Sequence, residues 1–217
     1  MTSVTKIDQP REVWDRLFAT PGQLAMITTV DMEGRVNACS VATCVRIVHD
    51  PVQISFCTDM HKDTARNVLD TGEFVVNLPS FEKALLEQVC IVGVPFAPGV
   101  NELEKAGLGE TPSRKVTPPR ITECKRHFEC EVAWTHEWDG RLMVAGTAVA
   151  ASIDEGCVDE KGFILWRKLK PVHYCGAPYN NVTPGHSMFV GCYETMSVPL
   201  LYDGPEVEIT RRTWEKL

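Results

Sequence analysis

Most of the structural information in this chain lies in one segment, Lys62-Asp-Thr-Ala-Arg-Asn-Val-Leu-Asp-Thr-Gly-Glu-Phe-Val-Val-Asn77. Residues 62–69 predict a short helix, and Thr71-Gly72 is a typical helix end. Residues 73–78 predict a strand, because the side chains of Phe74-Val75-Val76 are aromatic and β-branched. The segment therefore predicts a helix that is followed at once by a strand.

Three further strands are expected before this segment. Residues 23–30 predict a strand, and Asp31-Met-Glu-Gly34 predicts a turn with glycine where positive φ is tolerated. Residues 35–42 predict the returning strand, so the two strands form a hairpin. A third strand is expected over residues 52–58, after a turn at Asp50-Pro51.

Helices are expected at three other places. Residues 1–20 predict a short amphipathic helix, and residues 80–89 predict another. Residues 93–120 form a long, proline-containing excursion that includes a small helix over 101–106. Long loops in a compact domain often cover a site, so this excursion is expected to lie over one.

The remaining pattern favours β-structure. Residues 125–153 predict two strands around the turn Trp138-Asp-Gly140, and residues 163–172 predict a further strand. Many short strands and Gly-marked turns predict a mainly β protein, with a closed or nearly closed β-barrel and short helical additions. Residues 184–217 show weak periodicity and match no recognisable element.

The charge balance argues against two classes of partner. The chain has 22 Lys and Arg against 29 Asp and Glu, which gives a net charge of −7. Nucleic acids and anionic membranes attract clustered Lys and Arg, so neither is expected as a partner. The uncharged stretch 171–193 contains prolines and glycines, so it predicts loops and not a membrane span.

The cysteines predict free thiols in a reducing compartment. The chain has nine of them, an odd number, and the start MTSVTKIDQPREVW lacks the apolar region of a secretory signal. A cytoplasmic location is therefore expected. No C-x-x-C pair occurs, so no metal site is predicted, and buried thiols that act as small hydrophobic side chains are favoured instead.

One place in the pattern suits a phosphate group. Neither a G-x-G-x-x-G fingerprint nor a P-loop occurs. A strand ends near Thr58, however, and a helix begins at Lys62, where unpaired N–H groups carry about half a positive charge. Lys62 and Thr64 would add an ammonium and a hydroxyl, while Asp63 is expected to cap the helix and point aside. An ordinary capped helix with a solvent-exposed lysine is the alternative.

Three segments in order carry a resemblance to a known family. They are Ile27-Thr-Thr-Val-Asp-Met-Glu-Gly-Arg-Val-Asn37, His49-Asp-Pro51 and the segment 62–77. Together they resemble the flavin reductase-like family with the FMN-binding split-barrel fold, which includes flavoredoxin-type proteins. The similarity covers about residues 12–180. It implies a split-barrel domain over 1–183 and a homodimer with one FMN per subunit. Residues 184–217 match nothing in the family pattern, and they are expected to form a C-terminal extension, either an arm that reaches across the dimer or a solvent-side tail.

The resemblance also implies where the cofactor lies. Residues from 37 to 44 would lie along the isoalloxazine ring and the ribityl chain, residues from 55 to 58 would line the opposite edge, and the start of the following helix would hold the phosphate. The implied cofactor-binding residues are Asn37, Val41, Ala42, Thr43, Cys44, Ser55, Cys57, Thr58, Lys62, Asp63 and Thr64.

Three departures from the family pattern concern activity. Ala42 stands where relatives have serine, with Thr43 as a substitute, and Cys44 stands where an aromatic side chain is frequent. Arg141 stands where reductases often have a histidine near the nicotinamide.

The resemblance implies an FMN oxidoreductase that uses NADH or NADPH, and it assigns no catalytic residue. A flavoredoxin-like electron carrier served by a redox partner protein is the alternative. A metal-binding or structural barrel is a third possibility.

Overall fold

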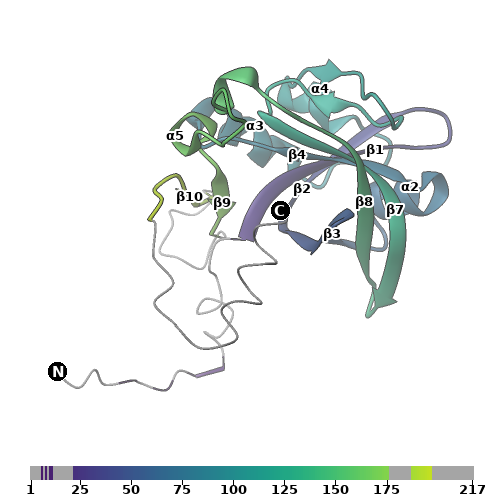
Figure 1. Ribbon diagram of the computed structural model, residues 1–217. Coiled ribbons are helices and arrows are strands. Elements are labelled where there is room, and N and C mark those ends of the chain that lie inside the picture. The colour runs from purple at the N-terminus through teal and green to yellow at the C-terminus, as the bar shows by residue number, and fades with distance from the viewer. Residues whose placement is uncertain (1–5, 7, 9, 12–21, 176–186, 197–217) are drawn as a thin grey trace, which may run out of the picture.

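Six antiparallel strands close on themselves at the centre of the structure, a computed structural model that describes residues 6, 8, 10, 11, 22–175 and 187–196 (Figure 1). The strands are β1 (Gly22–Val30), β2 (Val36–His49), β3 (Val52–Asp59), β4 (Glu73–Leu78), β7 (Arg126–Trp138) and β8 (Arg141–Ile153). Their order is β1-β2-β3-β8-β7-β4, and the barrel closes because β4 pairs with β1 as well as with β7. The predicted mainly β barrel is therefore confirmed.

Large side chains from several strands fill the interior of the barrel. Ile27 of β1 lies opposite Cys39 of β2 on one side and Val76 of β4 on the other. The rings of Phe56 and Phe74 meet edge to face, with centroids 5.2 Å apart. The interior residues that solvent does not reach at all are Ala25, Ile27, Phe56, Ala65, Phe74, Val76, Cys130 and Val144.

The helix and strand predicted over 62–78 are both present. Helix α2 (Asp63–Thr71) packs Ala65 and Val68 against the barrel, and β4 starts two residues after the helix ends. Gly72 ends the helix with φ 72°, the left-handed region that favours glycine. This local signal places the start of α2 directly after β3, where the candidate site lies.

Two more helices lie over a second hydrophobic core. These are α3 (Lys83–Val92) and α4 (Glu102–Ala106), which pack with Met26 and Ile121. Figure 1 shows that the tip of the β7–β8 hairpin extends away from α3 and α4. The predicted helix over 80–89 begins later than expected, because the Phe81 amide donates to the Lys170 carbonyl, 2.7 Å away.

The excursion over 93–120 is fastened to the barrel by buried polar side chains. It includes β5 (Glu110–Thr111), which pairs with β6 (Arg120–Ile121). The Glu129 carboxylate of β7 accepts the amide N–H groups of Arg114 and Lys115 at 2.9 and 2.7 Å. These bonds hold the excursion against the barrel, because a buried carboxylate needs donors to replace water.

The strand predicted over 163–172 is wrong. Helix α5 (Trp166–Leu169) occupies most of it, after a short 3₁₀ helix over Glu155–Cys157. The Asp159 carboxylate accepts the amide of Phe163 at 2.8 Å, which folds the chain into a turn before α5. Lys170 then takes φ 50° and ends the helix, so the extended backbone begins only at β9 (Val172–Tyr174).

Part of the predicted C-terminal extension joins this same sheet. Strand β10 (Phe189–Gly191) pairs with β9, which in turn pairs with the start of β1. The predicted helix over 1–20 lies almost wholly outside the described residues, as do residues 197–217. The domain boundary at 183 therefore stays a prediction. Among the helices of the described ranges, none has the length and apolar character needed to cross a membrane.

Candidate functional site

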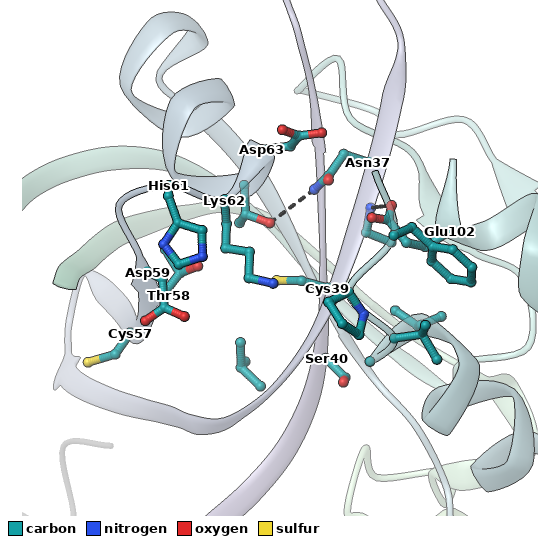
Figure 2. A pocket seen from close by; sticks show the side chains of 18 of the residues that line it. Asn37, Cys39, Ser40, Cys57, Thr58, Asp59, His61, Lys62, Asp63 and Glu102 are labelled. Carbon is teal, nitrogen blue, oxygen red and sulfur yellow. Dashed lines mark hydrogen bonds between the residues drawn. The ribbon is translucent and has the colours of Figure 1, made fainter. Parts of the chain in front are cut away.

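A cavity of about 530 Å³ opens where β2 and β3 separate (Figure 2). The two strands pair only from Val45 to His49 on β2, so the preceding part of β2 diverges from β3. Where this pairing stops, the Thr43 hydroxyl accepts the amide N–H of Cys57 at 3.0 Å. The separated strand edges leave backbone groups without strand partners beside the cavity, which suits a planar polar ligand.

Nine of the eleven predicted cofactor residues line this cavity. They are Asn37, Val41, Ala42, Thr43, Cys57, Thr58, Lys62, Asp63 and Thr64.

The other two predicted residues, Cys44 and Ser55, do not line it, and their contact with a cofactor stays a prediction. Successive side chains on a strand point to opposite faces, so Cys44 points into the barrel interior while Thr43 does not. Ser55 is completely covered, and its hydroxyl has no hydrogen-bond partner within the described part of the chain.

The start of α2 opens toward the cavity without a cap. Lys62 occupies the cap position, and its side chain makes no capping hydrogen bond. The amides of Asp63 and Thr64 have no acceptor among the described residues, whereas those of Ala65 and Arg66 bond to the Lys62 carbonyl. Two N–H donors therefore lie at the positive end of the helix, and the Lys62 side chain lines the same cavity.

The expectation that Asp63 caps α2 is wrong. Asp63 is the first residue of the helix, and its carboxylate accepts the amide N–H of Gly99 at 2.7 Å. The same carboxylate pairs with Arg66, also at 2.7 Å. The excursion over 93–120 brings Gly99 to this point, so a contact between distant segments, and not helix capping, sets the role of Asp63.

Below the start of α2 lies a set of buried hydrogen bonds. The side-chain amide of Asn37 donates to the hydroxyls of Thr29 and Thr64, at 3.1 and 3.0 Å. Asn67 donates to the same Thr29 hydroxyl at 3.1 Å. Asn37 is only 6% exposed, so most of its side chain serves these internal bonds.

The excursion covers one side of the cavity, as the sequence predicted. Pro95, Phe96 and Pro98 line it together with the end of α3. Glu102 lines it too, and its carboxylate accepts the amide N–H of Ala38 at 2.9 Å. That amide belongs to the stretch of β2 that β3 does not reach, so Glu102 takes the place of a strand partner.

Several charged and polar lining residues were not predicted from the sequence as site residues. Besides Glu102, they are Asp59, His61 and Arg141. Arg141 forms an ion pair of 2.5 Å with Asp59 across the β3–β8 pairing. For Arg141, its place in the family pattern was the one feature of the sequence that could have pointed to the site. His61 and Asp59 adjoin the predicted phosphate site, but no motif marks them.

Desolvation raises the pKa of three side chains that line the cavity, those of Cys39, Cys57 and Glu102. Burial raises the pKa of Glu102 above its ordinary value, against the opposing effect of the Ala38 amide. Burial also raises the pKa of the Cys39 thiol to about 11, so this lining cysteine stays protonated near neutral pH. In the ranges that the structure describes, no three His, Cys, Asp or Glu side chains gather as metal ligands.

A closed barrel with a cavity between two separating strands, beside an open helix start, defines the split-barrel class of proteins. The chain belongs to the flavin reductase-like family, because the model of the flavin reductase like domain matches residues 17–182. The family expectation from the sequence is confirmed, as is the split-barrel fold.

Similar proteins agree with this assignment. An uncharacterized protein of Aquifex aeolicus is 33% identical over 168 residues, which covers 75% of this chain and 84% of the relative. The structure resembles that of 2-nitrobenzoate 2-nitroreductase NbaA of Pseudomonas fluorescens, with 25% identity and a TM-score of 0.75. The similarity covers 93% of this chain and 100% of that one. Flavoredoxin of Desulfovibrio vulgaris (Miyazaki F) shares the fold at 18% identity and a TM-score of 0.73, over 92% and 98% of the two chains.

Proposed function

We propose that this protein binds FMN in the cavity between β2 and β3 and passes electrons from NADH or NADPH through the flavin to an acceptor. The observation that carries the proposal is the uncapped start of α2, where the amides of Asp63 and Thr64 find no acceptor in the described part of the chain and Lys62 lines the cavity. Helix starts of this kind bind phosphate groups, because N–H donors and the helix dipole both favour a negative charge.

The remaining cavity suits the rest of the molecule. Its volume of about 530 Å³ lies within the usual range for small-molecule sites. Backbone groups of the separated strand edges can pair with the polar edge of a flavin ring, and small side chains such as Ala42 leave the ring room to approach. When bound, FMN supplies the redox chemistry, while the chain binds the molecule, orients it and limits its access to water.

Substitutions at the phosphate site test the proposal. We expect Lys62→Ala and Thr64→Ala each to weaken FMN binding by about 1–3 kcal/mol, since each removes a donor to a charged group. Riboflavin, which lacks the phosphate, should bind both variants as it binds the parent. Titration of flavin fluorescence gives both dissociation constants.

Lys83→Ala is the matched control for Lys62→Ala. The Lys83 side chain is 91% exposed on α3, and its ammonium lies 3.7 Å from the Glu87 carboxylate. Its loss should leave the affinity for FMN unchanged. Equal FMN affinity in the parent, Lys62→Ala and Thr64→Ala would show that the phosphate assignment is wrong.

A flavoredoxin-like electron carrier is the second candidate. The observation that favours it is the ion pair between Arg141 and Asp59 on the cavity wall, because Arg141 stands where reductases of the family often have a histidine near the nicotinamide. Steady-state oxidation of NADH and NADPH by the FMN-loaded protein separates the two. Rapid turnover of NADH or NADPH supports the reductase. If neither nucleotide reduces the flavin and a reduced partner protein does, the carrier is supported.

We also propose that the protein is a homodimer. Large apolar side chains are exposed on β2 and on the β7–β8 hairpin: Val45, Ile47, Trp134 and Trp138. Exposed apolar groups of this size favour association with another protein surface. Light scattering should give a mass of twice the chain's 24.2 kDa, and a value of one chain would refute the dimer.

A reducing, cytoplasmic location is proposed on the basis of the thiols. Cys39, Cys44, Cys57 and Cys130 are free although they lie in or beside the barrel core and the cavity. Proteins of oxidising compartments more often pair their cysteines. With a net charge of −7, neither nucleic acid nor a membrane is proposed as a partner.

A further inference from the structure

The buried hydrogen bonds below α2 join three elements that are distant in sequence. Thr29 lies on β1, Asn37 on β2, and Thr64 and Asn67 on α2. All four are buried, and Thr64 is 1% exposed. Water therefore does not compete for their hydrogen bonds, and each bond keeps its donor and its acceptor.

The direction of these bonds determines what the Thr64 hydroxyl can do. Both hydrogens of the Asn37 amide are used, one toward Thr29 and one toward Thr64 (Figure 2 shows the second). A hydroxyl has one hydrogen to donate and two lone pairs to accept with. Because the Thr64 oxygen already accepts from Asn37, its own hydrogen is left for another acceptor.

Two acceptors are within reach of that hydrogen. One is the sulfur of Cys39, a weak acceptor that lines the same cavity and whose pKa the Thr64 side chain lowers. The other is any group held in the cavity, which Thr64 lines. A phosphate oxygen is charged and forms the stronger bond, so a bound phosphate would take the hydrogen from the thiol.

We propose that Asn37 is a positioning residue that acts through Thr64. By donating to the Thr64 oxygen, Asn37 makes the hydroxyl a donor toward the phosphate and makes the cavity selective for FMN over riboflavin. This inference rests on the proposed function, and it changes the role that the sequence implied for Asn37. The side chain was expected along the flavin ring, whereas its amide is directed to Thr29 and Thr64.

Asn37→Ala and Thr64→Val test the inference as a double-mutant cycle. Asn37→Ala alone should weaken FMN binding about tenfold and leave riboflavin binding within about twofold of the parent. In the Thr64→Val background, Asn37→Ala should have little further effect, because the group through which it acts is gone. Thr64→Ser keeps the hydroxyl and should retain most of the affinity for FMN.

Asn37→Asp is a second variant with nearly the same shape. A carboxylate accepts where the amide donates, so the Thr64 hydrogen would turn away from the phosphate. We expect at least a tenfold loss of FMN affinity beyond that of Asn37→Ala, from the reversed bond and the added charge together, with riboflavin binding retained. Circular dichroism and the urea midpoint show whether each variant is folded.

Four results would overturn the inference. Equal losses of FMN and riboflavin affinity in Asn37→Ala would mean a general structural role. Additive losses in the double variant would mean that Asn37 does not act through Thr64. If Thr64→Val and Lys62→Ala both bind FMN like the parent, the phosphate site is wrong and the inference fails with it. If these two variants lose FMN affinity while Asn37→Ala keeps that of the parent, only the role of Asn37 is refuted.

Discussion

Replacing Asn77 with alanine is expected to lower the free energy of unfolding by about 3–5 kcal/mol, because several buried partners lose their hydrogen bonds at once. Asn77 is completely buried on β4. Its amide donates to the Met26 carbonyl at 3.2 Å and to the Thr28 hydroxyl at 3.1 Å. Its oxygen accepts the amide of Ile121 at 2.8 Å, which ties β6 and the excursion to the barrel.

Urea denaturation followed by circular dichroism measures this loss. Asn101→Ala is the matched control, because Asn101 caps α4 by accepting the Leu103 amide at 2.9 Å at a more exposed place. Loss of such a cap costs about 1 kcal/mol. If the Asn77 and Asn101 variants unfold at the same urea concentration, Asn77 does not hold the excursion in the way described.

Replacing Gly22 with alanine is expected to destabilise the protein by about 3 kcal/mol, because a new Cβ atom would collide with backbone. That atom would lie 1.9 Å from the carbonyl oxygen of Ala42, and backbone cannot move aside as a flexible side chain can. The strands β1 and β2 would have to separate at this point. Since Ala42 lines the cavity, FMN affinity should fall together with stability.

Gly156→Ala is the control for this substitution. No atom lies within 4 Å of the position that its Cβ would occupy, so its stability should change by no more than about 0.5 kcal/mol. Unfolding midpoints and FMN titrations of both variants complete the comparison. A Gly22→Ala variant with the parent's midpoint would mean that the close approach of β1 and β2 is easily relieved.

Where the sequence predictions succeeded, short-range interactions were responsible. The helix and strand of 62–78 were recognised from β-branched side chains and from one glycine, Gly72, whose backbone conformation ends α2. The turn at Asp139-Gly140 between β7 and β8 is another such case, with positive φ at both residues. Where the pattern was ambiguous, as over 163–172, the side chain of Asp159 and the fixed conformation of Lys170 decided in favour of a helix.

For the site, the resemblance pointed to nine residues that line one cavity, and the differences from expectation share one cause. Cys44 and Ser55 were placed correctly along their strands, but closure of the barrel decides which strand side chains are covered. The role of Asp63 depended on Gly99, 36 positions away. Glu102 was predicted only as part of a helix, because its contact is with Ala38, 64 positions earlier.

The sequence alone thus determined the family, the positions of the main strands along the chain and the helix start that would hold a phosphate, since each depends on residues that are close together in the chain. The tertiary structure decided where β2 and β3 separate, what covers the cavity and toward which partner each polar side chain is directed. Those features depend on contacts between distant segments, and such contacts form only when the barrel closes and the excursion folds back over it.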